Sequence, residues 1–296
     1  MGNCLCKRKI VVIQNQIPCR KIVFDSTRFK KGALIGEGAY SKVYECLNLD
    51  TGVLYAVKHI ELAGTQDQVL REIYNLQQEI KTLQSLSHKN IVKYLYTDKD
   101  ENCSGVDIMM ELAPGGSLRT LLNKFGKFEE KVTIIYLTQI IEGLAYLHGQ
   151  GIIHRDIKSA NILVGQNGII KLSDFGASKR LNVGQINSEE EICKSLKGSP
   201  YWMAPEIVRR VGHTFSADIW SVGCVTIEML TGQAPWSTVS RSVTEVMKLL
   251  EQGKKPEIPE GLSGNCIKFI EACLQTEPGN RPTAKTLLNH PFLIIN

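Results

Sequence analysis

The spacing of apolar residues changes once along this 296-residue chain, and this change constrains the fold more than any other feature. From about Phe29 to Asn102, short runs alternate apolar and polar residues, which predicts β-strands with a single helix at about 66–86. After Gly115 and Gly116, apolar residues recur every three or four positions, which indicates helices. These helices are predicted at about 117–124, 129–149, 216–232, 241–252 and 263–274.

The pattern predicts an α+β fold in two parts. Residues 29–111 would form a small, mostly β part, and residues 117–293 a larger α-rich part. Pro114 and two glycines make residues 112–116 a hinge-like connection, and residues 1–28 precede both parts as a tail. With 43% apolar residues the chain can bury a sizeable core, and its apolar runs are too short to span a membrane.

The charge and the cysteines narrow the class of protein further. Residues 1–28 hold six basic residues and one acidic residue, which accounts for the whole net charge of +5. A neutral body argues against nucleic-acid binding, and a basic tail favours an anionic surface as its partner. Nine cysteines without paired spacing, and no secretory signal before them, predict free thiols in the cytosol.

The tail begins with the letters MGNCLCKRK, which make it a candidate lipid anchor. Gly2 is an acceptor position for myristate, although Cys6 stands where the motif has Ser or Thr. One acyl chain binds membranes only marginally, so a second anchor at Cys4 or Cys6 and nearby bases would be needed. The nearby bases are Lys7, Arg8 and Lys9. We therefore expect peripheral attachment to the cytoplasmic face of a membrane, while a disordered basic leader explains the same letters.

A glycine-containing segment and a lysine indicate phosphate binding in the β-rich part. Gly36 and Gly38 lie between two predicted strands, where their backbone N–H groups could approach an oligophosphate closely. A turn between strands explains these letters equally well. Lys58 follows on the next apolar strand, and a buried ammonium there needs an anion. Phosphate oxygens and Glu79 on the 66–86 helix are the expected partners, in preference to Glu72 on the same helix face.

A second cluster of chemically active residues lies in the α-rich part. Residues 154–163 read HRDIKSANIL and place Asp156, Lys158 and Asn161 close together, and Asp174 follows in DFG. Carboxylate and amide oxygens are hard ligands that suit Mg²⁺, and a lysine suits phosphate. The spacing therefore indicates one site that holds metal and phosphate.

These segments resemble those of eukaryotic protein kinases, and the resemblance extends over about residues 29–293. The motifs GEGAYSKV, AVK, HRDIKSAN, DFG, APE, DIWSVG and NRPT appear in order with suitable gaps. The resemblance implies two lobes around an ATP cleft, with ATP and Mg²⁺ as cofactors. Asp156 would accept or orient the proton of a substrate hydroxyl, Lys158 would neutralise the γ-phosphoryl group, and Asn161 and Asp174 would hold Mg²⁺.

The same resemblance assigns the residues that contact the nucleotide. The phosphates would lie under the glycine segment and against Lys58. The adenine ring would lie among apolar side chains and hydrogen-bond the backbone of the connection. The nucleotide-binding residues are Ile35, Gly36, Glu37, Gly38, Ala39, Tyr40, Val43, Ala56, Lys58, Met110, Glu111, Ala113 and Leu163. Among these, Met110 would guard the back of the pocket.

The resemblance also narrows the substrate. Lys158 within DIKSAN is similar to the serine/threonine-directed form of the catalytic loop. Residues 197–206, 212–237 and 281–292 most resemble the MAP kinase kinase kinase branch, which implies a protein substrate of the MAP kinase kinase type. The alternatives are a non-catalytic pseudokinase scaffold and a small-molecule phosphotransferase. The presence of Lys58, Asp156, Asp174 and the APE motif favours an active protein kinase over both.

Regulation is expected at the activation segment, residues 174–206. Arg155 would be a buried positive charge that favours a phosphate on this segment, added by an upstream kinase or by autophosphorylation. Ser195 is the first candidate and Ser188 the second, while Ser199 is expected to face the substrate. The acidic run 189–191 could substitute partly for phosphate, and a solvated charge run explains it equally well.

Two structural roles complete the expectations. Glu206 and Arg281 would form an ion pair that ties the activation segment to the α-rich part. Asp218, at the start of a helix, would cap and brace the catalytic loop.

Overall fold

The structure is a computed structural model that describes residues 28–294 apart from several short segments. The segments outside the description are 39–40, 63–68, 70–72, 75, 77–79, 82, 100–104, 175–178, 181–199 and 241. The chain forms two compact units. The first contains the described residues up to Ser85 together with Lys93–Leu112, and the second contains Leu86–Val92 and the described residues from Ala113 onward.

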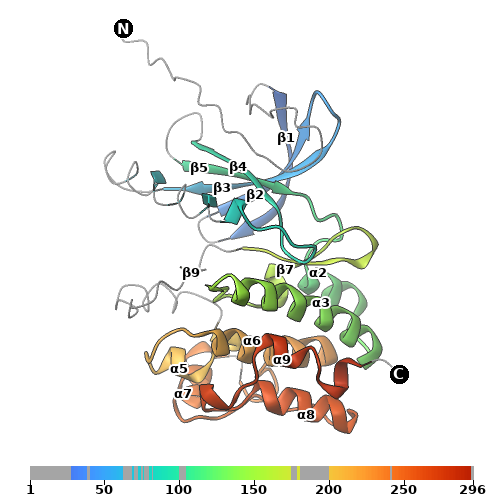
Figure 1. The fold of residues 1–296 in the computed structure, drawn as a ribbon, viewed down its shortest axis with the longest axis vertical. Helices are drawn as coiled ribbons and strands as arrows, with labels where there is room; N and C mark the ends of the chain where they lie inside the picture. The colour runs from blue at the N-terminus through green and yellow to red at the C-terminus, as the bar shows by residue number, and fades with distance from the viewer. Residues whose placement is uncertain are drawn as a thin grey trace. The chain divides into compact units, whose positions relative to one another are not determined.

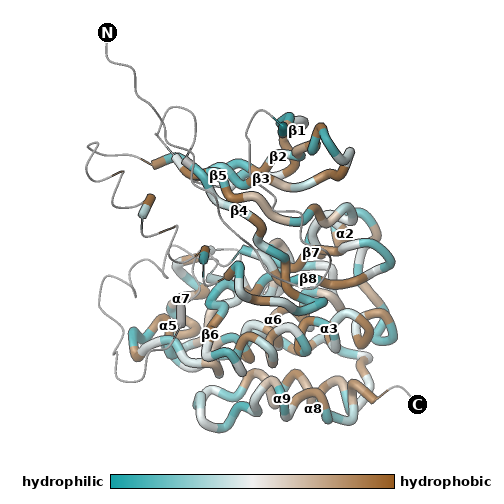
Figure 2. The backbone as a smooth tube through the Cα atoms, turned by 45° about the horizontal axis from the view of Figure 1, so that its top comes forward, coloured by the Kyte–Doolittle hydropathy of each residue, from teal (hydrophilic) through white to brown (hydrophobic). Residues whose placement is uncertain are grey.

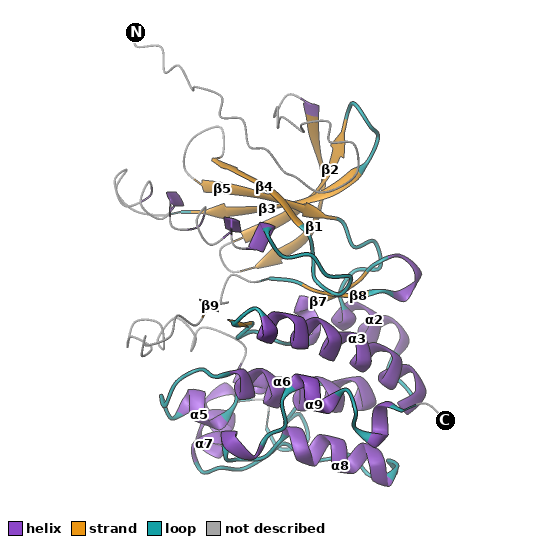
Figure 3. Ribbon diagram, viewed as in Figure 1, coloured by secondary structure: helices purple, strands orange, loops and turns teal. Residues whose placement is uncertain are grey.

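The first unit is built on a five-stranded antiparallel sheet with the order β1-β2-β3-β5-β4 (Figure 1, Figure 3). The strands are β1 (Phe29–Gly38), β2 (Ser41–Asn48), β3 (Leu54–Glu61), β4 (Tyr94–Lys99) and β5 (Gly105–Glu111). The pairing sets Val43 opposite Lys58, and Ala56 opposite Met110. Because side chains alternate along a strand, this register fixes which of these residues share a face of the sheet.

The helix predicted at 66–86 is present in the described residues of that segment. Val69, Ile73, Ile80 and Leu83 are helical and buried, so the predicted apolar stripe faces the core. Leu76 lies on the same stripe but is only half-buried. Glu72 and Glu79 lie outside the described residues, and the choice between them remains a prediction.

The second unit is mainly helical. Its helices are α2 (Leu118–Phe125), α3 (Glu130–Gly149), α5 (Pro205–Val208), α6 (Phe215–Thr231), α7 (Val243–Glu251), α8 (Gly264–Cys273) and α9 (Ala284–Leu287). From Ala217 to Leu230, every α6 residue except Ser221 is buried, and α6 packs against α3 and α8. The apolar stretches of α3 and α6 are visible in Figure 2. The all-round burial of α6 makes it the core helix of this unit.

The described part of the second unit also contains four short strands whose bounds were not predicted. β6 (Ile152–Ile153) pairs with β9 (Lys179–Arg180), and β7 (Ile162–Val164) pairs with β8 (Ile170–Leu172). After the glycine pair, only helices had predicted bounds, because two or three residues are too few to show the alternation of a strand. The β7–β8 hairpin follows the catalytic loop directly and so helps to position it.

Two further expectations concern the membrane and the thiols. Within the part of the chain that the structure describes, no helix combines the length and apolar character of a membrane span. The four cysteines in that part, Cys46, Cys224, Cys266 and Cys273, are buried free thiols, as predicted.

Candidate functional site

The catalytic loop brings Asp156, Lys158 and Asn161 into direct contact. Lys158 Nζ lies 2.7 Å from Asp156 Oδ2, and Asn161 Nδ2 donates to the same oxygen at 2.8 Å. Asn161 Nδ2 also donates to the Asp156 backbone oxygen at 2.9 Å. Oδ2 of Asp156 therefore takes both side-chain bonds, and no described side chain donates to Oδ1. This leaves one carboxylate oxygen able to receive a proton from a substrate.

The side chain of Asn161 is oriented by its amide nitrogen. Among the described residues, both bonds of this amide are made by Nδ2, and none is made by Oδ1. Its backbone oxygen accepts from Ser173 N–H and from Ser173 Oγ, each at 2.9 Å. Asp174 follows Ser173 with a φ of 60°, an uncommon backbone conformation for a residue other than glycine. The two serine bonds thus tie the backbone beside Asp174 to Asn161.

Asp218 supports this loop from α6. Its buried carboxylate accepts the backbone N–H groups of His154 and Arg155, each at 2.9 Å, and it lies 2.9 Å from His148 Nε2. Burial alone would raise the pKa of Asp218, but the interactions with His148 and His154 outweigh it and hold that pKa below its usual value. Asp218 therefore caps and braces the catalytic loop, as predicted, while Thr214 is the N-cap residue of α6 itself.

His154 is fully buried, and its hydrogen bonds define its tautomer. Nδ1 accepts from the Asp156 N–H at 3.3 Å, so Nε2 carries the proton and donates to the Ser173 backbone oxygen at 3.0 Å. Burial lowers the pKa of His154 despite the acidic groups around it, which favours the neutral ring. The ring therefore connects the backbone of Asp156 to the backbone beside Asp174.

Arg155 differs from its expected environment. It is half-buried rather than buried, and its φ of 70° places it in the left-handed region. Its backbone N–H bond to Asp218 holds this conformation. The regulatory candidates Ser188, Ser195 and Ser199 and the acidic run 189–191 lie outside the described residues, so these assignments remain predictions.

In the first unit, the strand register gathers several of the residues assigned to the nucleotide. Gly36 pairs with Val43 across β1 and β2, and Val43 pairs with Lys58 across β2 and β3. Ala56 and Met110 are buried opposite each other on β3 and β5, while Val43 and Lys58 are half-buried. A half-buried lysine can keep its ammonium group at the surface of the sheet.

The remaining nucleotide candidates are less enclosed or lie in the second unit. Ile35 is 47% exposed, and Glu37 and Gly38 are exposed at the tip of β1, next to the undescribed Ala39 and Tyr40. The Glu111 N–H donates to the Lys93 backbone oxygen at 3.0 Å and is therefore occupied. Ala113 and Leu163 are half-buried in the second unit.

The predicted ion pair between Glu206 and Arg281 is present. Arg281 Nη1 and Nη2 donate to the two carboxylate oxygens of Glu206 at 2.6 and 2.8 Å, which is the bidentate arrangement. Arg281 also donates to backbone oxygens of Gln275 and Ser216. The pair therefore anchors α5, which contains the last residues of the activation segment, to the body of the second unit.

One part of the network was not predicted from the sequence. Glu228 on α6 accepts hydrogen bonds from Arg119, Ser159 and Trp202. The sequence signal for this network was a single glutamate in an apolar helical run. A charged residue at such a position must be paired if it is buried. Its partners could not be read from the sequence because they lie 26 to 109 positions away.

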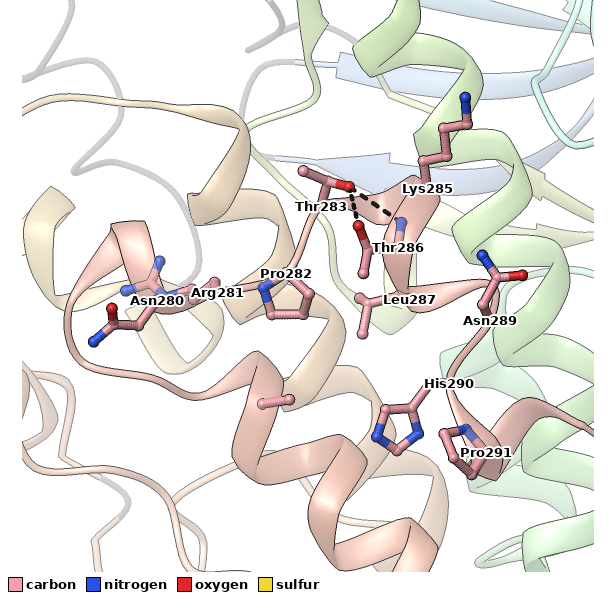
Figure 4. Close-up of a pocket in the computed structure, with 11 residues that line it drawn as sticks. Asn280, Arg281, Pro282, Thr283, Lys285, Thr286, Leu287, Asn289, His290 and Pro291 are labelled. Atoms are coloured by element: carbon pink, nitrogen blue, oxygen red, sulfur yellow. Dashed lines mark hydrogen bonds between the residues drawn. The ribbon is translucent and has the colours of Figure 1, made fainter.

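A hollow of about 660 Å³ lies around α9, far along the chain from the catalytic loop (Figure 4). Its walls include Thr283, Lys285 and His290, and Figure 4 shows the Thr283 hydroxyl bonded to Thr286. None of the catalytic-loop residues lines it. We therefore assign the function to the catalytic loop and not to this hollow.

The fold and the catalytic loop together define a protein kinase domain. Residues 29–293 match the family model described as "Protein kinase domain", and the chain belongs to this family. It is 47% identical over 270 residues to mitogen-activated protein kinase kinase kinase 2 of Arabidopsis thaliana, which covers 90% of this chain and 41% of that protein.

Two other relatives show the same relationship. Mitogen-activated protein kinase kinase kinase ANP1 of A. thaliana is 47% identical over 269 residues, covering 90% of this chain and 40% of that protein. Mitogen-activated protein kinase kinase kinase A of Dictyostelium discoideum is 43% identical over 271 residues, covering 90% of this chain and 28% of that protein. The chain thus spans about two fifths of the length of the two Arabidopsis relatives.

Proposed function

We propose that this protein is an ATP-dependent serine/threonine protein kinase of the MAP kinase kinase kinase type. The observation that carries the proposal is the contact of Asp156 with Lys158 and Asn161. Lys158 and Asn161 both bond Oδ2, so Oδ1 accepts the proton as the substrate oxygen bonds to the γ-phosphorus and the bond to ADP breaks. Lys158 lies beside this oxygen and can offset the charge of the moving phosphoryl group.

The resemblance to protein kinases assigns the nucleotide and the metal to particular residues. Gly36, Gly38 and Lys58 would bind the phosphates of ATP, with Glu79 as the partner of Lys58, and Ala56 and Met110 would contact adenine. Asn161 and Asp174 would hold Mg²⁺, and the support for this assignment is that no described residue bonds Oδ1 of Asn161. When bound, Mg²⁺ supplies positive charge to the phosphate oxygens.

The substrate class rests on the relatives. The similar proteins are named as kinases of MAP kinase kinases, so we propose a MAP kinase kinase as the protein substrate of this chain. The catalytic loop around Lys158 supports transfer to serine or threonine hydroxyls. The chain would therefore act within a MAP kinase cascade.

The test is phosphate transfer from labelled ATP to a purified, catalytically inactive MAP kinase kinase. Asp156→Asn keeps the size of the side chain and its bonds from Lys158 and Asn161, but removes the proton acceptor. We expect kcat to fall at least a hundredfold with KM for ATP nearly unchanged, because general-base catalysis contributes about 10²–10⁴-fold. Phosphate should appear on serine or threonine.

The same experiment separates the alternatives. Equal incorporation by the parent protein and by Asp156→Asn would contradict the proposal and favour a pseudokinase that binds nucleotide without catalysis. Phosphopeptide analysis of these reactions also tests Ser195, which we propose as the activating site. Phosphate on Ser195 in the parent but not in Asp156→Asn would indicate autophosphorylation, whereas its appearance only after incubation with cell extract would indicate an upstream kinase.

For the tail, we propose lipid attachment at Gly2, with Cys4 or Cys6 as the second anchor, on the cytoplasmic face of a membrane. The support is the basic run Lys7–Lys9 and the marginal affinity of a single acyl chain. Gly2→Ala should move the protein from the membrane pellet to the supernatant in cell fractionation. Unchanged membrane association would contradict the proposal.

A further inference from the structure

The carboxylate of Glu228 accepts three side-chain hydrogen bonds, and the proposed catalytic mechanism does not use it. Its side chain is 0% exposed. Oε1 accepts from Ser159 Oγ at 2.6 Å and from Arg119 Nη1 at 2.8 Å, and Oε2 accepts from Trp202 Nε1 at 2.9 Å. Both oxygens are therefore engaged by side chains from other segments.

These bonds favour an acceptor at this position. The indole of Trp202 and the guanidinium of Arg119 can only donate hydrogen bonds, so each needs an oxygen lone pair. Burial raises the pKa of Glu228, and the bonds from Ser159, Arg119 and Trp202 oppose this shift. With two obligatory donors and one hydroxyl around it, the ionised carboxylate satisfies every partner.

The three donors come from parts of the chain with different tasks. Ser159 begins the 3₁₀ turn η2 (Ser159–Asn161) of the catalytic loop, directly after Lys158. Trp202 ends the 3₁₀ turn η5 (Pro200–Trp202), two residues before the APE motif. Arg119 is on α2, which contacts η2. One carboxylate thus contacts both the loop that holds the catalytic residues and the end of the activation segment.

Both segments have a further anchor close to Glu228. The Trp202 backbone oxygen accepts from Ser221 Oγ on α6 at 2.8 Å, so Trp202 is held to α6 at its backbone and at its ring. On the other side, the Asn161 N–H donates to the Lys158 backbone oxygen at 2.9 Å across the turn that Ser159 begins. A shift of Ser159 would therefore move the two residues that bond Asp156.

We propose that Glu228 is a positioning residue that couples the catalytic loop to the segment before APE, through Ser159 on one side and Trp202 on the other. This inference rests on the proposed function, because its effect on rate requires the protein to be a kinase. Ser159 and Trp202 bond different oxygens of the Glu228 carboxylate. If one of them moves, the carboxylate turns, and the oxygen that accepts from the other moves with it. Misplacement of catalytic groups by about 1 Å can cost about a hundredfold in rate.

The first test does not depend on catalysis. Hydrogen exchange is measured at the amides of residues 159–161 and 201–203 in Ser159→Ala, in Trp202→Phe and in the parent protein. If Glu228 couples the segments, each change should speed exchange in both segments, about tenfold to a hundredfold, as expected for loss of a bond to a charged group. Ser159→Ala removes only a hydroxyl, so this variant should fold even if Trp202→Phe does not.

The proposal is overturned if each substitution speeds hydrogen exchange only in the segment that contains it. Glu130→Gln is the matched control, because Glu130 also bonds a serine far along the chain, Ser263, at 2.6 and 2.7 Å. It should leave exchange at 159–161 and 201–203 unchanged.

The second test measures rate. Glu228→Gln presents an amide NH₂ to one of the donors, so we expect kcat to fall about tenfold while KM for ATP stays within about twofold. In the double variant, Trp202→Phe removes the indole N–H that would face the new amide NH₂. The kcat of the double variant should therefore be no lower than that of Trp202→Phe alone. If the two single losses in kcat multiply in the double variant, the coupling is contradicted. If the parent protein and Asp156→Asn are equally inactive, the proposed function fails, and the exchange experiment alone still decides this inference.

Discussion

A single buried amide, that of Asn90, connects three segments of the second unit. Its Nδ2 donates to the Ile170 backbone oxygen at 2.8 Å and to Gln139 Oε1 at 3.2 Å, and its backbone oxygen accepts from the Leu172 N–H at 2.9 Å. Gly143 on α3 lies against it, since a Cβ there would come within 2.9 Å of the Asn90 backbone oxygen. The amide therefore joins the β7–β8 hairpin to α3.

Replacing this side chain should destabilise the second unit. In Asn90→Ala the Ile170 carbonyl loses a buried donor, which costs about 1–3 kcal/mol. We expect faster hydrogen exchange in the β7–β8 hairpin and in α3, and unchanged exchange in β1–β3.

Asn48→Ala is the matched control. Asn48 is also buried, but its Oδ1 accepts from the backbone N–H groups of Asp50 and Thr51 in the first unit. This variant should show the opposite pattern, with faster exchange around the turn between β2 and β3. If both variants loosen both units equally, Asn90 does not act locally.

Residues whose partners are close in sequence were the ones that could be predicted. Asp156, Lys158 and Asn161 lie within a few positions of one another, so their spacing alone indicates contact. The structure has that contact. Asn90 and Glu228 were missed because their bonds join residues tens of positions apart, and no local pattern encodes such a distance. The pair of Glu206 and Arg281 is equally distant, and it was found through the resemblance to a family.

Among the elements, α6 and α8 are packed so closely that one glycine sets their separation. A Cβ on Gly223 of α6 would lie 2.8 Å from Cys273 Cβ on α8 and 3.0 Å from Leu274 Cδ2. Real Cβ atoms do not approach a neighbouring Cβ this closely, so the helices would have to move apart.

Gly223→Ala should therefore lower the free energy of unfolding by about 1–3 kcal/mol, the usual cost of overpacking a core. Gly149→Ala, at the end of α3 where a Cβ meets nothing within 4 Å, is the control. It should change stability by no more than about 0.5 kcal/mol. Urea denaturation of both variants measures the difference. Equal stability of the two would show that α6 and α8 can separate at no cost.

The elements themselves were predicted well where they are long. The ends of α2, α3, α6, α7 and α8 fall within one or two residues of the predicted positions, because several turns of helical periodicity define them. The short helices α5 and α9 and the strands β6–β9 span two to four residues each and show no period. Their formation depends on pairing and packing with distant segments, which propensity cannot supply.

On the scale of the whole molecule, the spacing of apolar residues predicted two parts with different secondary structure, and the structure has two units whose boundary after the sheet falls at Leu112. What this spacing could not reveal is that residues 86–92, which follow the helix of the first unit, belong to the second. Asn90 and Val92 hydrogen-bond the backbone of Leu172, and Ile91 forms a β-bridge to it, so this assignment has a physical basis.

Because residues 86–92 belong to the second unit, the polypeptide passes between the units three times, after Ser85, after Val92 and after Leu112. A single cut at the last passage would leave the α-rich fragment without residues 86–92, and Leu172 without its backbone partners. The two halves are therefore not interchangeable modules. A chimaera that combines one unit of this protein with the other unit of a homologue would need residues 86–92 to come from the same protein as the helical unit.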